Sequence, residues 1–138
     1  KKIIESDVLK KRKIKKICLF GIAFKGYPET DDTRNSSFYD FYDVLSRKYK
    51  KSKIFAFDPM IKKNFSYKKL YYRNNFKDSL KNSDLVFILN DHNFFKKLKK
   101  NDYEKFLKKD SLIYDCWNLY NYKFKKIKYL SFGNILNN

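Results

Sequence analysis

The sequence predicts an α/β domain built on a doubly wound, mainly parallel sheet of about five strands, with helices on both faces. Apolar runs too short for a typical helix, such as residues 17–20 and 85–89, are typical of strands buried on both faces. Between these runs, apolar residues recur at helical spacing, as they do from Phe38 to Tyr49. Strands that alternate with helices favour a parallel, Rossmann-like sheet.

The elements follow in order along the chain. Residues 1–15 are rich in lysine and carry apolar residues at helical spacing, which fits a short helix before the first strand. Ser37 is expected to cap the next helix, because residues 37–40 resemble a capping box with Asp40 in place of glutamate. The further expected elements are strands at 53–57, 84–90, 111–115 and 128–131, a short edge strand around 70–72, and helices at 76–81, from Phe94 onward and at 102–108. We assign residues 14–138 to one domain and residues 1–13 to the tail of a preceding helix or linker.

The chain carries a formal net charge of +18, and a basic protein attracts phosphates. Arginine is the better bidentate phosphate ligand, yet only four of the 33 basic residues are arginine: Arg12, Arg34, Arg47 and Arg73. Lysine, asparagine, phenylalanine, tyrosine and isoleucine are abundant together, as an A+T-rich coding bias would produce. We therefore interpret the charge mainly as compositional background and do not expect nucleic acid as a partner.

Other functional classes have little support in the sequence. No apolar stretch approaches the roughly 20 residues of a membrane helix, and no apolar leader is visible, so we expect a cytoplasmic protein without a membrane partner. The first residue is lysine, which we interpret as the start of a fragment or processed piece. Cys18 and Cys116 lie in apolar runs without CxxC spacing and are expected to be buried thiols. The single histidine, His92, has no cysteine or histidine cluster around it, so no metal site is expected.

The most informative segment is the polar loop between the first strand and the helix that follows it. This loop carries Lys25, two adjacent aspartates and Arg34, and it ends at a helix N-terminus. In an open α/β sheet, such a loop lies at the carboxyl edge, where N–H groups and the helix dipole attract an anion. We interpret Asp31 and Asp32 as turn and helix-start residues that complement Arg34, in preference to paired acid/base carboxylates.

Two nucleotide-binding motifs can be set aside. Gly21 and Gly26 have the glycine spacing of a Walker A loop, but Tyr27-Pro28 follows where Lys-Ser/Thr is required. The sequence also has no GxGxxG, so a self-contained dinucleotide site of the usual kind is missing. Asp58 ends the second strand, where a Rossmann fold often places a ribose-binding carboxylate, but Pro59 follows directly and favours a role in the turn.

The residues Gly-Ile-Ala-Phe-Lys at 21–25 and Asp-Asp-Thr-Arg-Asn-Ser-Ser at 31–37 resemble a motif of a known family. That motif opens the C-terminal, UDP-binding domain of the UDP-glucose/GDP-mannose dehydrogenase family. Later segments resemble that domain in the same order: a strand ending in Phe-Asp-Pro at 57–59, a turn containing His92, and a strand ending in Asp115. The resemblance covers about residues 14–133 and implies a nucleotide-sugar-binding domain.

The resemblance also implies roles for individual residues. Phe24 and Lys25 correspond to the family's Phe-Lys pair, which contacts the nucleotide-sugar substrate. Arg34 corresponds to an arginine that reaches toward the NAD of the other domain; a salt bridge to a neighbouring aspartate is its alternative role, and the two can coexist. Trp117 stands where many members carry a substrate-contacting arginine. It is a third substrate-binding candidate, with a packed core or rim tryptophan as the alternative. His92 is left as a structural residue.

The chemistry that the resemblance implies needs parts that these residues lack. The family oxidises the sugar C6 alcohol to a uronate in two NAD-dependent steps, with a catalytic cysteine and an N-terminal NAD-binding half upstream of this domain. The implied protein is therefore part of an oxidoreductase, inactive alone, with a UDP-sugar, NAD, the N-terminal half and a second subunit as partners. Two alternatives stay open: a basic nucleic-acid-binding α/β domain, and a non-catalytic remnant that serves as an interaction module.

Overall fold

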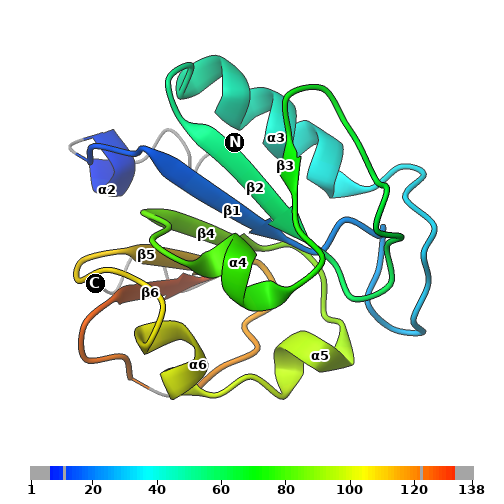
Figure 1. Ribbon diagram of the computed structural model, residues 1–138. Helices are drawn as coiled ribbons and strands as arrows, with labels where there is room; N and C mark the ends of the chain where they lie inside the picture. Colours follow the sequence, from blue (N-terminus) through cyan, green and yellow to red (C-terminus); the bar gives the residue numbers. More distant parts are fainter. Residues whose placement is uncertain (1–6, 11, 122, 133–138) are drawn as a thin grey trace.

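A six-stranded parallel sheet runs through the computed structural model, which describes residues 7–10, 12–121 and 123–132 (Figure 1). Its strands are β1 (Lys16–Phe20), β2 (Lys53–Phe57), β3 (Tyr71–Tyr72), β4 (Leu85–Ile88), β5 (Leu112–Asp115) and β6 (Lys128–Ser131). They are ordered β3-β2-β1-β4-β5-β6, and all five pairings are parallel. This order belongs to the doubly wound, Rossmann-like fold, in which the direction of winding changes between β1 and β4. The fold class is confirmed, and the sixth strand is the short edge strand expected around residues 70–72.

Helices cover both faces of the sheet. They are α2 (Asp7–Lys10), α3 (Ser37–Lys48), α4 (Phe76–Leu80), α5 (Asn93–Lys96) and α6 (Lys100–Glu104). Figure 1 shows α3 on one side of the sheet and α4, α5 and α6 on the other. The long polar loop after β1 and helix α5 both lie where the strand arrows end, on the right of the view.

The two faces have separate apolar cores because successive strand residues point to opposite sides. In β1, Ile17 and Leu19 belong to the cluster that also contains Phe38 of α3, whereas Cys18 and Phe20 belong to the cluster on the other face. These four residues of β1 are fully buried. This two-sided burial explains why the strands appear in the sequence as continuous apolar runs. Leu9 of α2 is also buried in the α3-side core, so part of the segment before residue 14 packs against the sheet.

The prediction that Ser37 caps α3 is wrong by one residue. The N-cap is Ser36, whose Oγ accepts a hydrogen bond from the backbone N–H of Phe38 at 3.1 Å. Either serine could cap a helix, and burial distinguishes them, because Ser36 is buried and Ser37 is exposed. With Ser36 as the cap, Tyr39 occupies the position of the capping-box acid, so that motif is absent; Asp40 remains in the first turn.

The short helices also differ from their predicted bounds. Helix α6 begins at Lys100, before the predicted start at residue 102, because the Asp102 carboxylate accepts a hydrogen bond from the Lys99 N–H at 2.7 Å and caps the turn. Helix α5 begins at Asn93, one residue before the predicted start. Helix α4 ends at Leu80, one residue before the predicted end.

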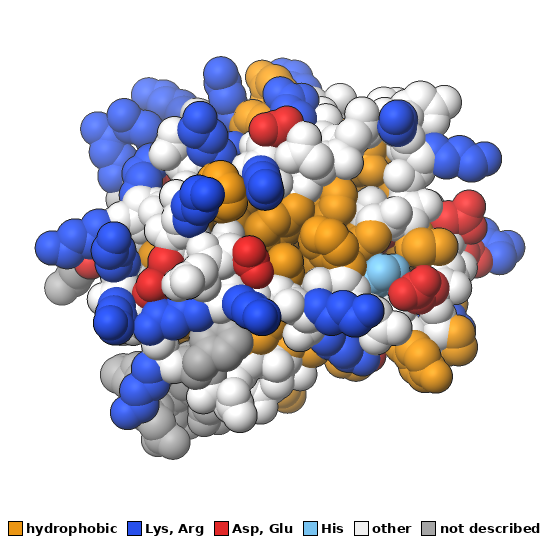
Figure 2. Space-filling model, turned by 60° about the horizontal axis from the view of Figure 1, so that its bottom comes forward, with side chains coloured by type: hydrophobic (Ala, Val, Ile, Leu, Met, Phe, Trp, Pro, Cys, Tyr) orange, Lys and Arg blue, Asp and Glu red, His pale blue; other side chains and the backbone are white. Residues whose placement is uncertain are grey.

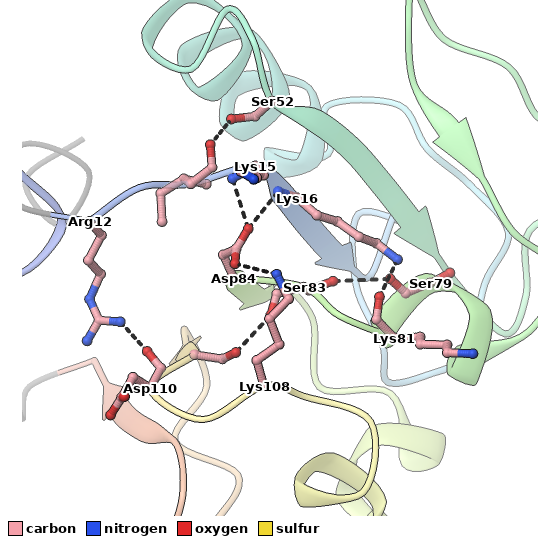
Figure 3. Close-up of polar contacts among 12 residues, drawn as sticks. Arg12, Lys15, Lys16, Ser52, Ser79, Lys81, Ser83, Asp84, Lys108 and Asp110 are labelled. Carbon is pink, nitrogen blue, oxygen red and sulfur yellow. Dashed lines mark hydrogen bonds and ion pairs between the residues drawn. The ribbon is translucent and has the colours of Figure 1, made fainter.

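At the amino edge of the sheet, one carboxylate joins three segments (Figure 3). Oδ2 of Asp84 accepts hydrogen bonds from the backbone N–H groups of Lys15 and Lys16 at 2.8 and 2.9 Å. Its Oδ1 lies 2.9 Å from the ammonium of Lys108. Asp84 thus fixes the start of β1 against β4 and against the segment that leads into β5.

Candidate functional site

The candidate site lies at the carboxyl edge of the sheet, where β1 and β4 end. Open α/β sheets bind ligands at this edge, at the point where the winding direction changes. Here the loop of residues 21–36 follows β1, and a short turn of residues 89–92 follows β4. These two segments, with the loop after β5, carry the residues that the sequence singled out.

The β1 loop is held in place by a buried carboxyl group. Oδ2 of Asp58, at the end of β2, accepts hydrogen bonds from the N–H groups of Ile22 and Ala23 at 2.7 and 2.9 Å. Oδ1 accepts from the N–H of Met60 at 2.8 Å, which is the turn role expected from the sequence. Asp58 is 2% exposed, so its oxygens are occupied by backbone donors and do not face a ribose. No sequence pattern predicts the two long-range hydrogen bonds to Ile22 and Ala23.

Both glycines of this loop are needed for close packing against the β4 turn. Gly21 has φ +94°, and a Cβ added there would come within 2.7 Å of the Asn90 side chain. A Cβ at Gly26 would collide with the backbone nitrogen of His92. The glycine spacing that resembles a Walker A loop therefore serves contact between two loops of the sheet.

Phe24 is exposed on this loop, and Lys25 next to it is half-buried. The N–H of Phe24 donates to the carbonyl of Asp32 at 2.9 Å, which closes the loop on itself. The Phe24 ring is 44% exposed, and the Lys25 ammonium lies 5.2 Å from its centroid. Among the described residues Lys25 has no ion-pair partner, so its ammonium can meet an anion.

Arg34 pairs with Asp32 on the same loop. Its Nε lies 3.0 Å from Oδ1 and its Nη2 lies 2.6 Å from Oδ2 of Asp32. These hydrogen bonds from Arg34 lower the pKa of Asp32 to about 2. The Arg34 side chain is nevertheless 86% exposed, so the salt bridge considered as its alternative role is present and leaves the guanidinium open to solvent.

Trp117 lies on the loop after β5, which a second buried carboxyl group organises. The Asp115 side chain accepts hydrogen bonds from the N–H groups of Trp117 and Leu119, at 2.8 and 2.6 Å, and from the Tyr129 hydroxyl at 2.8 Å. The indole N–H of Trp117 donates to the Leu89 carbonyl at 2.9 Å. With 49% of its surface exposed, Trp117 sits at the rim of the carboxyl edge.

His92 caps a helix, which is a structural role of the kind expected from the sequence. Its Nδ1 accepts a hydrogen bond from the N–H of Phe94 at 2.9 Å and so caps α5. Its Nε2 lies 3.3 Å from Oε1 of Glu29 on the β1 loop. Sequence reasoning missed both the cap and the facing glutamate, because histidine is not among the preferred N-cap residues and Glu29 is distant in sequence.

Neither cysteine has the environment of a nucleophile. Burial raises the pKa of the Cys18 thiol far above its usual range and that of Cys116 to about 12. Both cysteines are free thiols. Because the thiolate is the reactive form, neither would attack an electrophile at neutral pH.

A separate hollow lies on the face that carries α4, α5 and α6. A cavity of about 590 Å³ is lined there by apolar and polar side chains: Phe57, Asn74, Asn75, Phe76, Lys77, Asp78, Phe94, Leu98, Asp102 and Phe106. Figure 2 shows apolar surface across this face with lysine and arginine side chains around it. None of the four predicted site residues lines this cavity.

The described part of the chain has neither a metal-binding cluster nor a helix that could span a membrane. No three histidine, cysteine, aspartate or glutamate residues come together there as a metal-binding group. Of the helices described, none combines the length and the apolar character needed to cross a bilayer.

Comparison with known proteins identifies a family. Residues 18–122 match the model of the UDP-glucose/GDP-mannose dehydrogenase family, UDP binding domain. UDP-N-acetyl-D-mannosamine dehydrogenase of Methanococcus vannielii is 33% identical over 113 residues, which are 80% of this chain and 24% of that protein. The enzyme of the same name from Methanococcus aeolicus is 30% identical over 128 residues, 88% of this chain and 27% of that protein. The chain thus spans about a quarter of the length of these relatives.

Solved structures agree with the fold. The UDP-N-acetyl-mannosamine dehydrogenase of Staphylococcus aureus matches with a TM-score of 0.73 and 28% identity, over 94% of this chain and 29% of its own. An NDP-N-acetyl-D-galactosaminuronic acid dehydrogenase of Methanosarcina mazei Go1 gives a TM-score of 0.74 at 22% identity, over 87% of this chain and 25% of its own. At that identity, the second match supports the fold alone.

Proposed function

This chain belongs to the UDP-glucose/GDP-mannose dehydrogenase family, as its UDP-binding domain, and from that premise we propose that it binds a UDP-sugar at the carboxyl edge of its sheet. The observation that carries this proposal is the β1 loop. Asp58 and two glycines hold the base of the loop, while Phe24 is exposed and Lys25 is half-buried beside it. A fixed loop suits a diphosphate when its lysine has no carboxylate partner among the described residues.

Each candidate residue has a proposed role in this site. The Lys25 ammonium pairs with a diphosphate oxygen or a sugar hydroxyl, and the Phe24 ring shields that contact from water. Trp117 offers the face of its indole to a ring of the ligand, since its N–H is already bonded to the Leu89 carbonyl. Where many family members carry an arginine that contacts the substrate, this chain has Trp117. We propose that the sugar is recognised there by stacking on the indole and not by hydrogen bonds from a guanidinium.

The substrate we propose is a UDP-N-acetylhexosamine, in the first place UDP-N-acetyl-D-mannosamine. Both relatives at 30% identity or more carry the name of the dehydrogenase for that sugar. The nucleic-acid alternative has no comparable support, because the family match and these relatives are nucleotide-sugar enzymes.

We further propose that the parent enzyme oxidises the sugar C6 alcohol to a uronate, with NAD accepting a hydride in each of two steps. The described residues fit only a peripheral contact to NAD. The glycines of the β1 loop pack on the β4 turn, and the Asp58 carboxyl holds backbone N–H groups, so neither is free for a dinucleotide. Arg34, exposed at the carboxyl edge, is the residue that would reach the cofactor. We therefore place the main NAD site in an N-terminal half of the enzyme.

Partners and location complete the proposal. Related enzymes are more than three times as long as this chain, which leaves room for an NAD-binding half and a subunit interface. We propose a homodimer for the complete enzyme and a cytoplasmic location, where the free thiols of Cys18 and Cys116 would stay reduced.

Calorimetric titration of the chain with UDP, UDP-N-acetylmannosamine, UDP-glucose and GDP-mannose tests the proposal. We expect saturable binding of UDP compounds, weakened about tenfold or more in Lys25→Ala, because a charge-assisted contact is lost. Lys51→Ala is the matched control, since Lys51 is exposed just before β2 at the opposite edge of the sheet. Equal loss in both variants would mean that only net charge matters, and the proposal would fail. Titration with an oligonucleotide at two salt concentrations would reveal binding driven by net charge.

A further inference from the structure

The β1 loop rests on the turn after β4 at three successive points. The side-chain amide of Asn90 donates to the carbonyl of Ala23 at 3.3 Å. The backbone at Gly26 lies against the backbone of His92, with no room for a Cβ. Further along, the Glu29 carboxylate faces the His92 imidazole. Phe24 and Lys25 lie between the first and second of these points, so the turn after β4 supports the segment proposed to meet the substrate.

The protonation of His92 follows from its contacts. Nδ1 accepts the Phe94 N–H, so that nitrogen carries no proton and the proton of the neutral ring is on Nε2. This Nε2–H is buried and has no hydrogen-bond partner among the described residues. Oε1 of Glu29 lies 3.3 Å away, within reach of a hydrogen bond but without the direction of one.

A buried N–H without a partner is unfavourable, and a small shift of the loop would remove the penalty. The imidazole is only 8% exposed and fixed by the cap of α5, whereas the Glu29 side chain is 43% exposed on the loop. The glutamate is therefore the partner that can move. A second contact restrains the same stretch, because the Lys96 ammonium lies 5.7 Å from the Tyr27 ring centroid and pairs with Asp91 at 3.2 Å.

We propose that His92 and Glu29 form a latch that positions Phe24 and Lys25 for the UDP-sugar. The Nε2–H of His92 donates to the Glu29 carboxylate in a directed hydrogen bond when the loop tightens around the ligand, as contacts at binding sites often do. His92 is a positioning residue in this scheme and touches no reacting atom. The inference rests on the proposed UDP-sugar site and adds the contact that holds its loop in position.

Two substitutions at His92 separate the latch from the helix cap. Asparagine places an oxygen near Nδ1 and retains the cap, but it cannot reach Glu29. Glutamine places an amide N–H near Nε2 and can reach Glu29, but it loses the cap. We expect His92→Asn to keep its unfolding midpoint and bind UDP about tenfold more weakly or worse, which is the loss of one hydrogen bond to a charged group. His92→Gln should lower the unfolding midpoint while retaining more of the affinity for UDP.

Substitutions at Glu29 separate the latch from a simple charge effect. Glu29→Gln keeps the acceptor oxygen and should bind UDP nearly as the wild type does, whereas Glu29→Ala should show the loss seen in His92→Asn. Repulsion between Glu29 and the diphosphate would instead make both variants bind more tightly. In the double variant, His92→Asn should add no further loss to Glu29→Ala, because the two residues act through one contact. The exposed Asp31→Asn on the same loop is the control.

The outcomes distinguish the latch from the binding site itself. If the wild type does not bind UDP, the proposed function fails and the latch with it. If the wild type binds UDP and the His92→Asn and Glu29→Ala variants bind equally well, the latch is wrong and the proposed function stands. Should His92→Asn fail to fold, the comparison of Glu29→Ala with Glu29→Gln still decides the question.

Discussion

At the scale of single residues, polar side chains at the strand ends build the site without entering its chemistry. Asp58 after β2, Asn90 after β4 and Asp115 at the end of β5 are all at most 2% exposed. Asp58 and Asp115 accept backbone N–H groups of a loop, and Asn90 donates to a loop carbonyl. A carboxylate at the end of a strand can suggest an acid/base group. Here the carboxylates of Asp58 and Asp115 already accept hydrogen bonds from backbone N–H groups, so they are not placed to exchange a proton with a ligand. The residues left for a ligand are those that these groups position.

Asp58→Asn should destabilise the protein by about 2 kcal/mol and weaken UDP binding. One carboxyl oxygen accepts the Ile22 and Ala23 N–H groups and the other accepts the Met60 N–H. An amide replaces one acceptor by a donor, so at least one buried N–H would face another donor. Urea unfolding measures the loss of stability, and Asp31→Asn is the exposed control. Unchanged stability would show that the loop does not depend on this carboxyl group.

Sequence reasoning identified the exposed and half-buried residues of this edge better than the fully buried ones. Phe24 and Lys25 were recognised from a motif, and both lie on a loop of the carboxyl edge, which the order of strand and helix predicted. The hydrogen bonds of Asp58 to Ile22, and the approach of Glu29 to His92, join segments 36 and 63 residues apart. Such contacts depend on how two loops meet in space, which hydrophobic periodicity does not encode.

At the scale of elements, the predictable parts are those with strong apolar patterns. The four-residue β4 and the 12-residue α3 were predicted from an apolar run and an apolar stripe. The short helices α5 and α6 have four and five residues, too few for a periodic pattern, so local caps set their bounds. Capping by His92 and by Asp102 explains why these helices begin earlier than predicted.

The contact that joins β1 to β4 at the amino edge gives stability a pH dependence (Figure 3). Burial alone would raise the pKa of Asp84, but hydrogen bonds from the Lys108 ammonium and from the Lys16 and Lys15 N–H groups outweigh it and lower that pKa. A carboxyl group with a lowered folded-state pKa stabilises the fold above its unfolded pKa of about 4. This contribution is lost as the pH falls through the folded value.

Asp84→Asn should therefore be less stable than the wild type at pH 7, by roughly 1 kcal/mol for a partly exposed group. The difference should shrink as the pH falls below about 4, because the wild-type carboxylate is then protonated. Urea unfolding of both proteins between pH 7 and pH 3 measures this, with the exposed Asp31→Asn as control. A gap that stays constant over the whole range would show that the charge of Asp84 does not contribute.

At the scale of the whole molecule, one two-sided sheet places the candidate site residues along its carboxyl edge. Both faces of the sheet have an apolar core, and the carboxyl edge presents Phe24, Lys25, Arg34 and Trp117. At this edge the Arg34 guanidinium is exposed, and Lys25 has no ion-pair partner among the described residues. The net charge of +18 was interpreted from the sequence as background, and nothing in the family match requires it to bind nucleic acid.

The chain alone should bind a UDP-sugar without oxidising it. Its β1 loop packs its glycines on the β4 turn and leaves no dinucleotide site there, and burial keeps both Cys18 and Cys116 as thiols. We expect no NADH absorbance when the chain is mixed with UDP-N-acetylmannosamine and NAD, at concentrations where calorimetry shows the sugar nucleotide bound.

We propose that the NAD site lies in the part of the Methanococcus vannielii relative that the match does not cover. Joining the chain to that part should give NADH formation, reduced by Lys25→Ala and unchanged by Lys51→Ala. Substitution of Cys18 or Cys116 by serine should leave that turnover in place, because the nucleophile is expected in the other half. The opposite result is NADH formation by the isolated chain that either serine substitution abolishes. That result would locate the reaction in these residues and contradict the proposal that this domain only binds the substrate.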